Sequence, residues 1–183
     1  SRPAIKGNIR LLPSPQIVFR NGYLHTVYAY DPDGFGTGDV IDVFYRRYNP
    51  GTSTWSAEVR INDDGTTRDQ YQPTVSVGAA GQVTVGYYSR QLDPNNLSYD
   101  YYSRTSFDNG ATWTRPSVRL TDTSSPVVLD TSLATCYHGD YDQQLQDEDG
   151  RAHYLWSDDR GGTPDVFTDR TLVGTNYLLV PVA

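Results

Sequence analysis

The stretch Ser106-Phe107-Asp108-Asn109-Gly110-Ala111-Thr112-Trp113 decides the fold that the sequence predicts. Asp and Asn side chains bond to nearby backbone in tight turns, and Gly supplies the positive φ that such a turn needs. Thr and Trp directly afterwards favour a new strand. The stretch therefore predicts a tight turn between two strands, and its shape depends on five residues at fixed spacing: Ser106, Asp108, Gly110, Thr112 and Trp113.

The composition favours strands over helices. Of the 183 residues only 37% are hydrophobic, but 15 are Tyr and 3 are Trp. Aromatic rings bury a large area while keeping a polar group, so they offset a mean hydropathy of −0.59. Thr, Val and Tyr are frequent and long runs of Leu, Ala, Glu or Lys are absent, which predicts an all-β domain with a sizeable core.

Charge and cysteine content limit the function classes. A net charge of −7 argues against nucleic acid or an anionic membrane as a partner, and fits a soluble extracellular protein, cation binding, or solubility alone. Cys136 is the only cysteine, so no internal disulfide is expected, and no apolar run is long enough to span a membrane. The chain has no methionine and no signal-peptide pattern at Ser1, which predicts a processed or trimmed product.

An internal repeat organises the chain. An Ile/Val-Arg-Ile/Leu strand recurs, each copy is followed by a hairpin whose second arm is rich in aromatics, and an Asp-led strand comes next. A period of about 50 to 65 residues with four short strands is the scale of a β-propeller blade, and a generic β-sandwich is the alternative. The sequence predicts one β-repeat domain over 1–183, with blade-like units at about 14–62, 63–121 and 122–183 and an orphan outer strand at 8–12.

About three blades do not close a ring of the usual four to eight. An open arc would leave sheet faces and strand edges exposed, which favours association. Three solutions stay open from the sequence: a longer parent chain, a six-bladed ring made by self-association of two copies, or a filament that pairs strand edges between subunits.

Two motifs resemble one known family. The pattern S-x-D-x-G-x-T-W of the turn at 106–113 resembles the Asp-box, or BNR repeat, of sialidase-like β-propellers and related secreted proteins. Gly139-Asp140-Tyr141 together with Trp156-x-Asp158-x-Arg160 resembles a blade of bacterial secreted sialidase-like proteins. The resemblance implies an all-β, sialidase-like β-propeller segment of about three four-stranded blades, closed or completed by assembly, and an extracellular location. It also implies that the turn is structural and lies away from the ligand.

In a propeller of this kind the inner strands begin at the mouth that faces the ligand. Two such starts, at 69–72 and 137–142, are polar and aromatic. Aromatic faces stack on sugar rings, and carboxylates and guanidinium groups bind hydroxyls, so carbohydrate is the predicted partner. The predicted ligand-binding residues are Asp69, Tyr71, His138, Asp140, Tyr141, Trp156 and Arg160. The alternative is that Asp140 and Arg160 form a structural ion pair and that the tyrosines are core residues.

The catalytic residues of sialidases have no clear counterparts here. That family uses three arginines, a Tyr nucleophile assisted by Glu, an acid/base Asp and an Arg-Ile-Pro motif, whereas Arg10 is followed by Leu11-Leu12-Pro13 and the only glutamates are Glu58 and Glu148. The favoured function is a non-catalytic module for glycan or surface recognition, or for assembly. The alternatives are a glycoside hydrolase that uses Asp69 and Asp140, and a structural subunit that polymerises through exposed strand edges.

Two further patterns concern modification and metal. Asn96-Leu97-Ser98 matches the acceptor pattern for N-glycosylation. The loop from Asp31 to Asp39 alternates acids with glycines, so Asp31, Asp33 and Asp39 could surround a hard cation such as Ca²⁺. The loop lacks the Glu of an EF-hand, and similar loops between strands also occur without metal.

Calcium titration tests the predicted cation site. If Asp31, Asp33 and Asp39 bind Ca²⁺ in the folded chain only, added calcium raises the melting temperature, since a ligand that binds only the native state stabilises it. Thermal unfolding followed with and without millimolar calcium measures this effect. A melting temperature that does not change with calcium removes the site.

Overall fold

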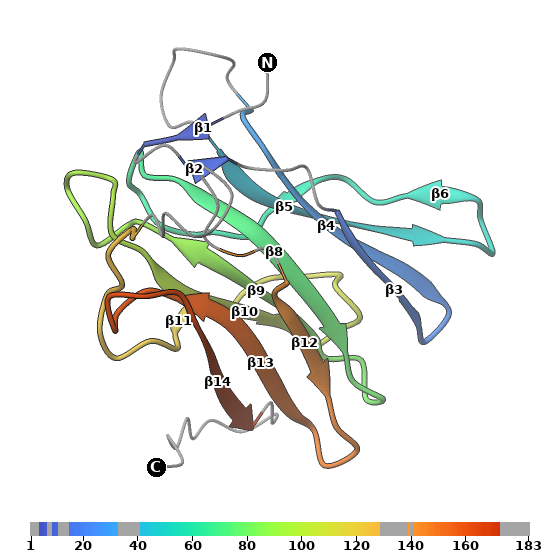
Figure 1. The fold of residues 1–183 in the computed structure, drawn as a ribbon. Helices are drawn as coiled ribbons and strands as arrows, with labels where there is room; N and C mark the ends of the chain where they lie inside the picture. Colours follow the sequence, from blue (N-terminus) through green and yellow to red (C-terminus); the bar gives the residue numbers. More distant parts are fainter. Residues whose placement is uncertain are drawn as a thin grey trace.

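A computed structural model describes residues 4–6, 9–10, 15–32, 41–128, 139 and 141–172. These residues form strands, turns and loops without any helix, and hence without a helix that could cross a membrane. Three antiparallel sheets stand beside one another along the chain (Figure 1). Each sheet lies within one of the three units that the repeat predicts.

The first sheet has the strand order β3-β4-β5-β6, and β7 also pairs with β5; the second has the order β8-β9-β10-β11 and the third β12-β13-β14. A separate two-stranded pair, β1 and β2, precedes them. The bounds are β1 Ala4–Ile5, β2 Ile9–Arg10, β3 Gln16–Arg20, β4 Tyr23–Tyr30, β5 Asp42–Asn49, β6 Thr54–Trp55, β7 Val59–Arg60, β8 Gln70–Val77, β9 Val83–Ser89, β10 Asp100–Ser106, β11 Val118–Arg119, β12 Gln143–Gln146, β13 Arg151–Asp158 and β14 Asp165–Leu172.

The three sheets have the same orientation, so equivalent ends of their strands lie at the same end of the molecule. At one end, which we call the polar end, β8 begins, β9 and β13 finish, and an aspartate opens the third strand of each sheet: Asp42, Asp100 and Asp165. At the other, which we call the turn end, lie the hairpin turns at 21–22, 78–81 and 147–150 and the turn at 106–113. This common orientation brings equivalent positions of the three sheets to the same end of the molecule.

A repeated ion pair explains the recurring Val-Arg strand. Arg60 of β7 lies 3.4 Å from Asp42, and Asn62 donates to the same carboxylate at 2.6 Å. In the second sheet Arg119 of β11 lies 2.6 Å from Asp100, and Thr121 donates to that carboxylate at 2.7 Å. The short outer strand is therefore fixed to the Asp-led strand by its arginine and by the polar residue two positions later.

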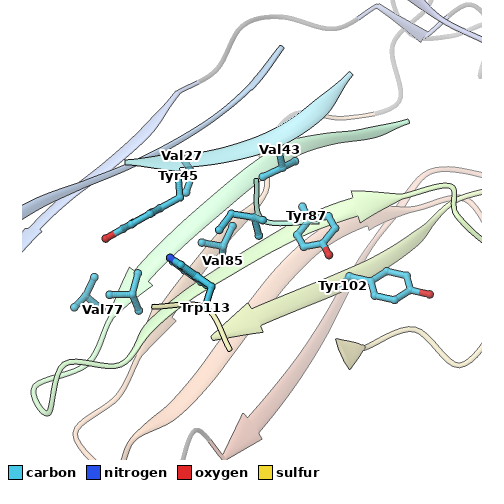
Figure 2. Close-up of a cluster of buried hydrophobic side chains, with 10 residues drawn as sticks. Val27, Val43, Tyr45, Val77, Val85, Tyr87, Tyr102 and Trp113 are labelled. Carbon is cyan, nitrogen blue, oxygen red and sulfur yellow. The ribbon is translucent and has the colours of Figure 1, made fainter. Parts of the chain in front are cut away.

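Two hydrophobic clusters lie between neighbouring sheets. One joins the first sheet to the second, where the Tyr45 ring meets the Trp113 ring edge-on at 4.9 Å (Figure 2). The other joins the second sheet to the third, where Tyr101 stacks on Trp156 at 5.1 Å. Such ring pairs add to the gain from burying apolar area. The core of the chain is thus made of contacts between sheets.

The first strands of the sheets are joined by polar contacts. Strand β8 contacts both β3 and β12. The amide of Gln144 in β12 accepts from Thr74 at 2.9 Å and donates to Ser76 at 3.0 Å, both in β8. Gln146 donates to Thr84 of β9 at 2.9 Å. Glutamine side chains therefore bridge the second and third sheets at their inner edges.

The turn at 106–113 is held by its own side chains. Asp108 accepts from Ser106 Oγ at 2.7 Å, from Thr112 N at 2.8 Å and from Thr112 Oγ1 at 2.6 Å, while Gly110 N donates to Ser106 Oγ. Partial burial acts to raise the pKa of Asp108, but the bonds from Thr112 and Ser106 outweigh it and hold that pKa below its ordinary value. All the predicted turn residues except Trp113, which is core, take part in these bonds.

The same turn also binds the first sheet. Asn109 O accepts from Arg47 of β5, in the first sheet, at 2.9 Å. Within the second sheet, Asn109 N donates to Gly81 O at 2.8 Å. Asn21, in the first hairpin turn, donates to Gly78 O at 3.0 Å. The turn is therefore a joint between two sheets as well as a connection between two strands.

We expect Gly110→Ala to destabilise the chain more than Gly22→Ala. Both glycines have a positive φ, which costs an L-residue about 1–2 kcal/mol. A Cβ at Gly22 meets nothing within 4 Å, whereas one at Gly110 would lie 1.9 Å from the Tyr45 hydroxyl. The clash should add roughly 1–3 kcal/mol. Urea unfolding of both variants measures the difference, and equal losses would contradict the role of the turn as a joint.

His25 is buried beside Tyr45, with its Nδ1 2.7 Å from the Tyr45 hydroxyl. Burial lowers its pKa from 6.5 to about 4, and the charge of Arg47 acts in the same direction. The histidine is therefore neutral in the folded chain near neutral pH.

The lowered pKa predicts a loss of stability in acid. Between pH 6.5 and about 4 the unfolded chain binds a proton at His25 that the folded chain does not. The free energy of unfolding should therefore fall across this window, by about 3 kcal/mol in total. Unfolding curves from pH 7 to 4 measure the fall. His25→Gln should lack this component and His153→Gln, a surface control, should keep it; identical slopes in all three proteins would contradict the prediction.

Candidate functional site

Five of the seven predicted ligand-binding residues belong to the described ranges, and all five lie at or near the polar end. Asp69 directly precedes β8 and Tyr71 lies at its start, Tyr141 precedes β12, and Trp156 lies near the end of β13 with Arg160 two residues beyond it. His138 and Asp140 lie outside the described residues. The structure thus brings these five residues to one end of the second and third sheets.

Asp69 is fully buried and belongs to a network that fixes the loop after β9. Its carboxylate lies 3.6 Å from Arg90, which is also fully buried, and accepts from Asn96 Nδ2 at 2.7 Å. Arg90 donates to Lys6 O at 2.8 Å and to Asn96 O at 2.9 Å. The predicted glycosylation acceptor Asn96 thus uses one of the two N–H groups of its side-chain nitrogen to bind Asp69.

Tyr71 is a core residue in this structure. Its ring stacks on Tyr88 at 5.1 Å with an interplanar angle of 13°, and neither side chain is exposed. The guanidinium of Arg90 lies over the Tyr71 ring, 5.5 Å from the ring centre. Burial raises the pKa of Tyr71. The ring is therefore covered by protein and does not present a face to solvent.

Asp142 and Tyr88 link the second and third sheets at the same end. Tyr88 donates to Asp142 at 2.5 Å and accepts from Ser157 N at 2.8 Å. Burial, and then the charge of Asp142, raise the pKa of Tyr88 well above its ordinary value, so the phenol stays neutral and acts as a donor. Sequence reasoning did not identify this pair, because the two residues are far apart in the chain and lie in segments whose aromatic content only indicated strands.

Trp156 and Arg160 are also engaged with protein groups. Trp156 stacks on Tyr101 and donates from Nε1 to Asp158 at 3.2 Å. Arg160 binds Asp158 at 2.7 Å, pairs with Asp122, and lies over the Phe167 ring at 4.5 Å. The bond to Asp158 is the main cause of a raised pKa at Arg160. The guanidinium therefore connects the loop after the second sheet to the third.

Tyr141 is different, because 84% of its side chain is exposed. Gly139, two residues before it, has φ +113, and a Cβ there would lie 2.1 Å from Ser157 Oγ. Its carbonyl accepts from Gln72 Nε2 at 3.2 Å. Gly139 thus lies against Gln72 of the second sheet and Ser157 of the third.

Gln72 sits at a β-bulge that the sequence did not indicate. The register of β8 against β9 shifts between Tyr71 and Thr74, and Gln72 has φ +47. A positive φ in a residue other than glycine is costly and is often found next to functional sites. The only sequence signal is Pro73, which restricts the residue before it and removes a donor from the strand.

A second tyrosine–carboxylate group lies on the outer side of the first sheet. Glu58, which is exposed, accepts from Tyr28 at 2.5 Å and from Tyr30 at 2.7 Å. Burial is the main cause of the raised pKa of Tyr28, and the bond to Glu58 is the main cause at Tyr30. Sequence reasoning did not expect a Tyr–Glu nucleophile pair. The structure does contain a Tyr–Glu contact, in which both phenols donate to Glu58 and their raised pKa values keep them protonated near neutral pH.

The predicted cation site lies mostly outside the described ranges. Asp33 and Asp39 are not described, and Asp31 follows directly after β4. Within the part of the chain that the structure covers, no group of three His, Cys, Asp or Glu side chains is arranged to hold a metal ion. Calcium binding at Asp31, Asp33 and Asp39 therefore stays a prediction.

A hollow of about 220 Å³ lies beside the turn at 106–113, at the opposite end from Tyr141. Its lining includes Asp108, Thr112 and Ser106, whose polar atoms form the bonds inside the turn. These groups are already used to shape the turn, so the polar end is the better candidate for ligand binding.

Comparison with known proteins identifies the fold. No family model matches the sequence, and no curated protein matches it. Among solved structures, the chain is similar to one described as Hadza microbial sialidase Hz136, with a TM-score of 0.59 over 86% of this chain at 16% identity. It is also similar to the α-L-arabinanase of Penicillium chrysogenum complexed with arabinobiose, with a TM-score of 0.53 over 77% of this chain at 17% identity.

These similarities confirm the predicted fold class: the chain is an all-β segment of the sialidase-like propeller type. It spans 34% of the length of the first structure and 38% of the second. At such identities the likeness concerns the fold and not the activity.

Proposed function

We propose that this chain is a non-catalytic carbohydrate-recognition segment that works outside the cell, and that its ligand contacts the polar end beside Tyr141. The observation that carries the proposal is the contrast between Tyr141, which is 84% exposed, and the described charged residues of the polar end, which bind other protein groups: Asp69, Asp142 and Arg160. An exposed aromatic ring suits stacking on the C–H face of a sugar.

The state of the acids favours recognition over hydrolysis. Glycoside hydrolysis needs two carboxyl groups that reach the substrate from opposite sides of the scissile bond. Asp69 is fully buried with Arg90, and Asp142 is buried and bound to Tyr88. Neither carboxylate is free to act as a general acid or base in this arrangement.

The second candidate is a glycoside hydrolase whose site includes Asp140 and Asp69. The observation in its favour is that two of the solved structures of similar fold are described as a sialidase and an arabinanase. This function would require Asp69 to exchange its bond with Asn96 for one with a substrate.

Binding to a glycan array tests the proposed function. We expect binding of at least one glycan class, and a loss of about tenfold in affinity for Tyr141→Ala, because the exposed ring is removed. Tyr141→Phe should retain binding. Trp55→Ala removes another exposed ring, 46% exposed on the first sheet, and serves as the matched control.

Two results would contradict the proposal: no binding to any glycan, or equal binding by Tyr141→Ala and the unmodified chain. A panel of aryl glycosides tests the second candidate. Turnover that disappears in both Asp69→Asn and Asp140→Asn would support a hydrolase, and absence of turnover in a chain that binds glycan would support recognition alone.

A further inference from the structure

The dipeptide Asn-Gly occurs twice in the sequence, each time in a turn at the turn end. Asn21-Gly22 joins β3 to β4, and Asn109-Gly110 lies in the turn at 106–113 (Figure 1). Both asparagines have a positive φ, 52 and 55, and so have both glycines, 80 and 74. The two dipeptides thus have nearly the same φ angles, and they differ in what surrounds them.

An asparagine that precedes a glycine can lose its side-chain ammonia to an attack by its own backbone. The backbone nitrogen of the glycine gives up its proton and bonds to Cγ of the asparagine, which closes a succinimide ring while Nδ2 leaves as ammonia. Water then opens the ring at either carbonyl and leaves aspartate or isoaspartate. The net change is amide plus water to carboxylate plus ammonium. Glycine favours the attack because it has no Cβ to hinder it.

The first dipeptide is open to solvent. Asn21 and Gly22 are both exposed, and a Cβ added at Gly22 would meet nothing within 4 Å. Nδ2 of Asn21, the atom that would leave, donates to Gly78 O at 3.0 Å and to Asn109 Oδ1 at 3.1 Å. Water and base therefore reach the Gly22 amide, and the turn has room to bring its nitrogen to Cγ of Asn21.

The second dipeptide is enclosed. Gly110 is buried, its N–H donates to Ser106 Oγ at 3.0 Å, and a Cβ there would overlap the Tyr45 hydroxyl. The carbonyl of Asn109 accepts from Arg47 at 2.9 Å. Ring closure at Asn109 would have to break the bond to Ser106 and move buried backbone. Such a loss adds to the barrier and should slow the reaction about tenfold or more.

We propose that Asn21 is a site of spontaneous deamidation in the folded chain, that the fold protects Asn109 in the same dipeptide, and that the change at Asn21 weakens the joint between the first and second sheets. The contrast between the exposed Gly22 and the buried, bonded Gly110 carries the first two parts. The bond from Asn21 to the second sheet carries the third.

The weakening follows from the atom that is lost. After deamidation a carboxylate oxygen takes the place of Nδ2 and faces Gly78 O, so two acceptors meet without a proton between them. Asn109 can turn its own amide nitrogen toward the new carboxylate, but a backbone carbonyl cannot make this change. Isoaspartate also adds a methylene to the main chain of the two-residue turn between the paired Arg20 and Tyr23. Either product therefore loosens the contact with the second sheet.

Peptide mapping by mass spectrometry tests the reaction. The folded chain is kept at mildly alkaline pH and sampled over time, and Asn21 should convert about tenfold or more faster than Asn109. In concentrated urea the two sites should react at similar rates, because the fold is the source of the difference. Equal rates in the folded chain, a faster reaction at Asn109, or an unreactive Asn21 when the unfolded chain reacts would overturn the proposal.

A substitution tests the cause of the protection. Ser106→Ala removes the acceptor of the Gly110 N–H, so deamidation at Asn109 should speed up while that at Asn21 stays unchanged. Thr112→Ala is the matched control, since it removes a bond to Asp108 in the same turn and leaves the Gly110 N–H bonded. Circular dichroism confirms that each variant is folded; if Ser106→Ala is not, the comparison of folded and unfolded chains decides alone. A folded Ser106→Ala with unchanged rates would contradict the protection.

Thermal unfolding of Asn21→Asp tests the weakened joint. This variant has the product carboxylate at full occupancy, and its melting temperature should lie below that of the unmodified chain. Asn49→Asp is the matched control, because it adds the same charge in the same sheet and Asn49 uses its oxygen, which aspartate retains, to accept from Gly51 N. A melting temperature of Asn21→Asp equal to that of Asn49→Asp would mean that another group, such as Arg47, compensates, and would overturn the third part of the proposal.

Discussion

The packing of aromatic side chains between neighbouring sheets is the contact on which the rest of the structure depends. Tyr45 with Trp113, and Tyr101 with Trp156, place large rings where one sheet meets the next. Because the hydrophobic residues of this chain are few and the rings are many, a single sheet could not bury enough area to be stable alone. The unit of stability is therefore a pair of sheets rather than one sheet.

The polar residues serve the same arrangement. Aspartates at the polar end bind arginines of the short outer strands, and the turn at 106–113 ties the second sheet to the first. Asp69 and Asp142 are likewise used to fix loops and to join sheets. As a consequence, the carboxylates of Asp69 and Asp142 are buried and bonded, whereas Tyr141 at the same end is exposed.

Local interactions could be predicted from the sequence, and remote ones could not. The turn at 106–113 was predictable because Asp108 bonds to Ser106 and Thr112, within a few residues of itself. The Asp-led and Val-Arg strands were visible as a repeat, which is why the fold class follows from the sequence. The partners of Asp69 and Tyr71 are Arg90, Asn96 and Tyr88, about twenty residues or more away, so their burial left no trace in the local pattern. The bulge at Gln72 depends on the packing of β8 and was equally hidden.

The central claim is that aromatic contacts between neighbouring sheets hold the chain folded. Urea unfolding of Tyr45→Ala and Tyr101→Ala tests it most directly, because each substitution removes one ring of a pair that joins two sheets. The account predicts that each lowers the free energy of unfolding by about 3–5 kcal/mol. Losses no larger than that of Tyr141→Ala, which removes an exposed ring, would contradict it.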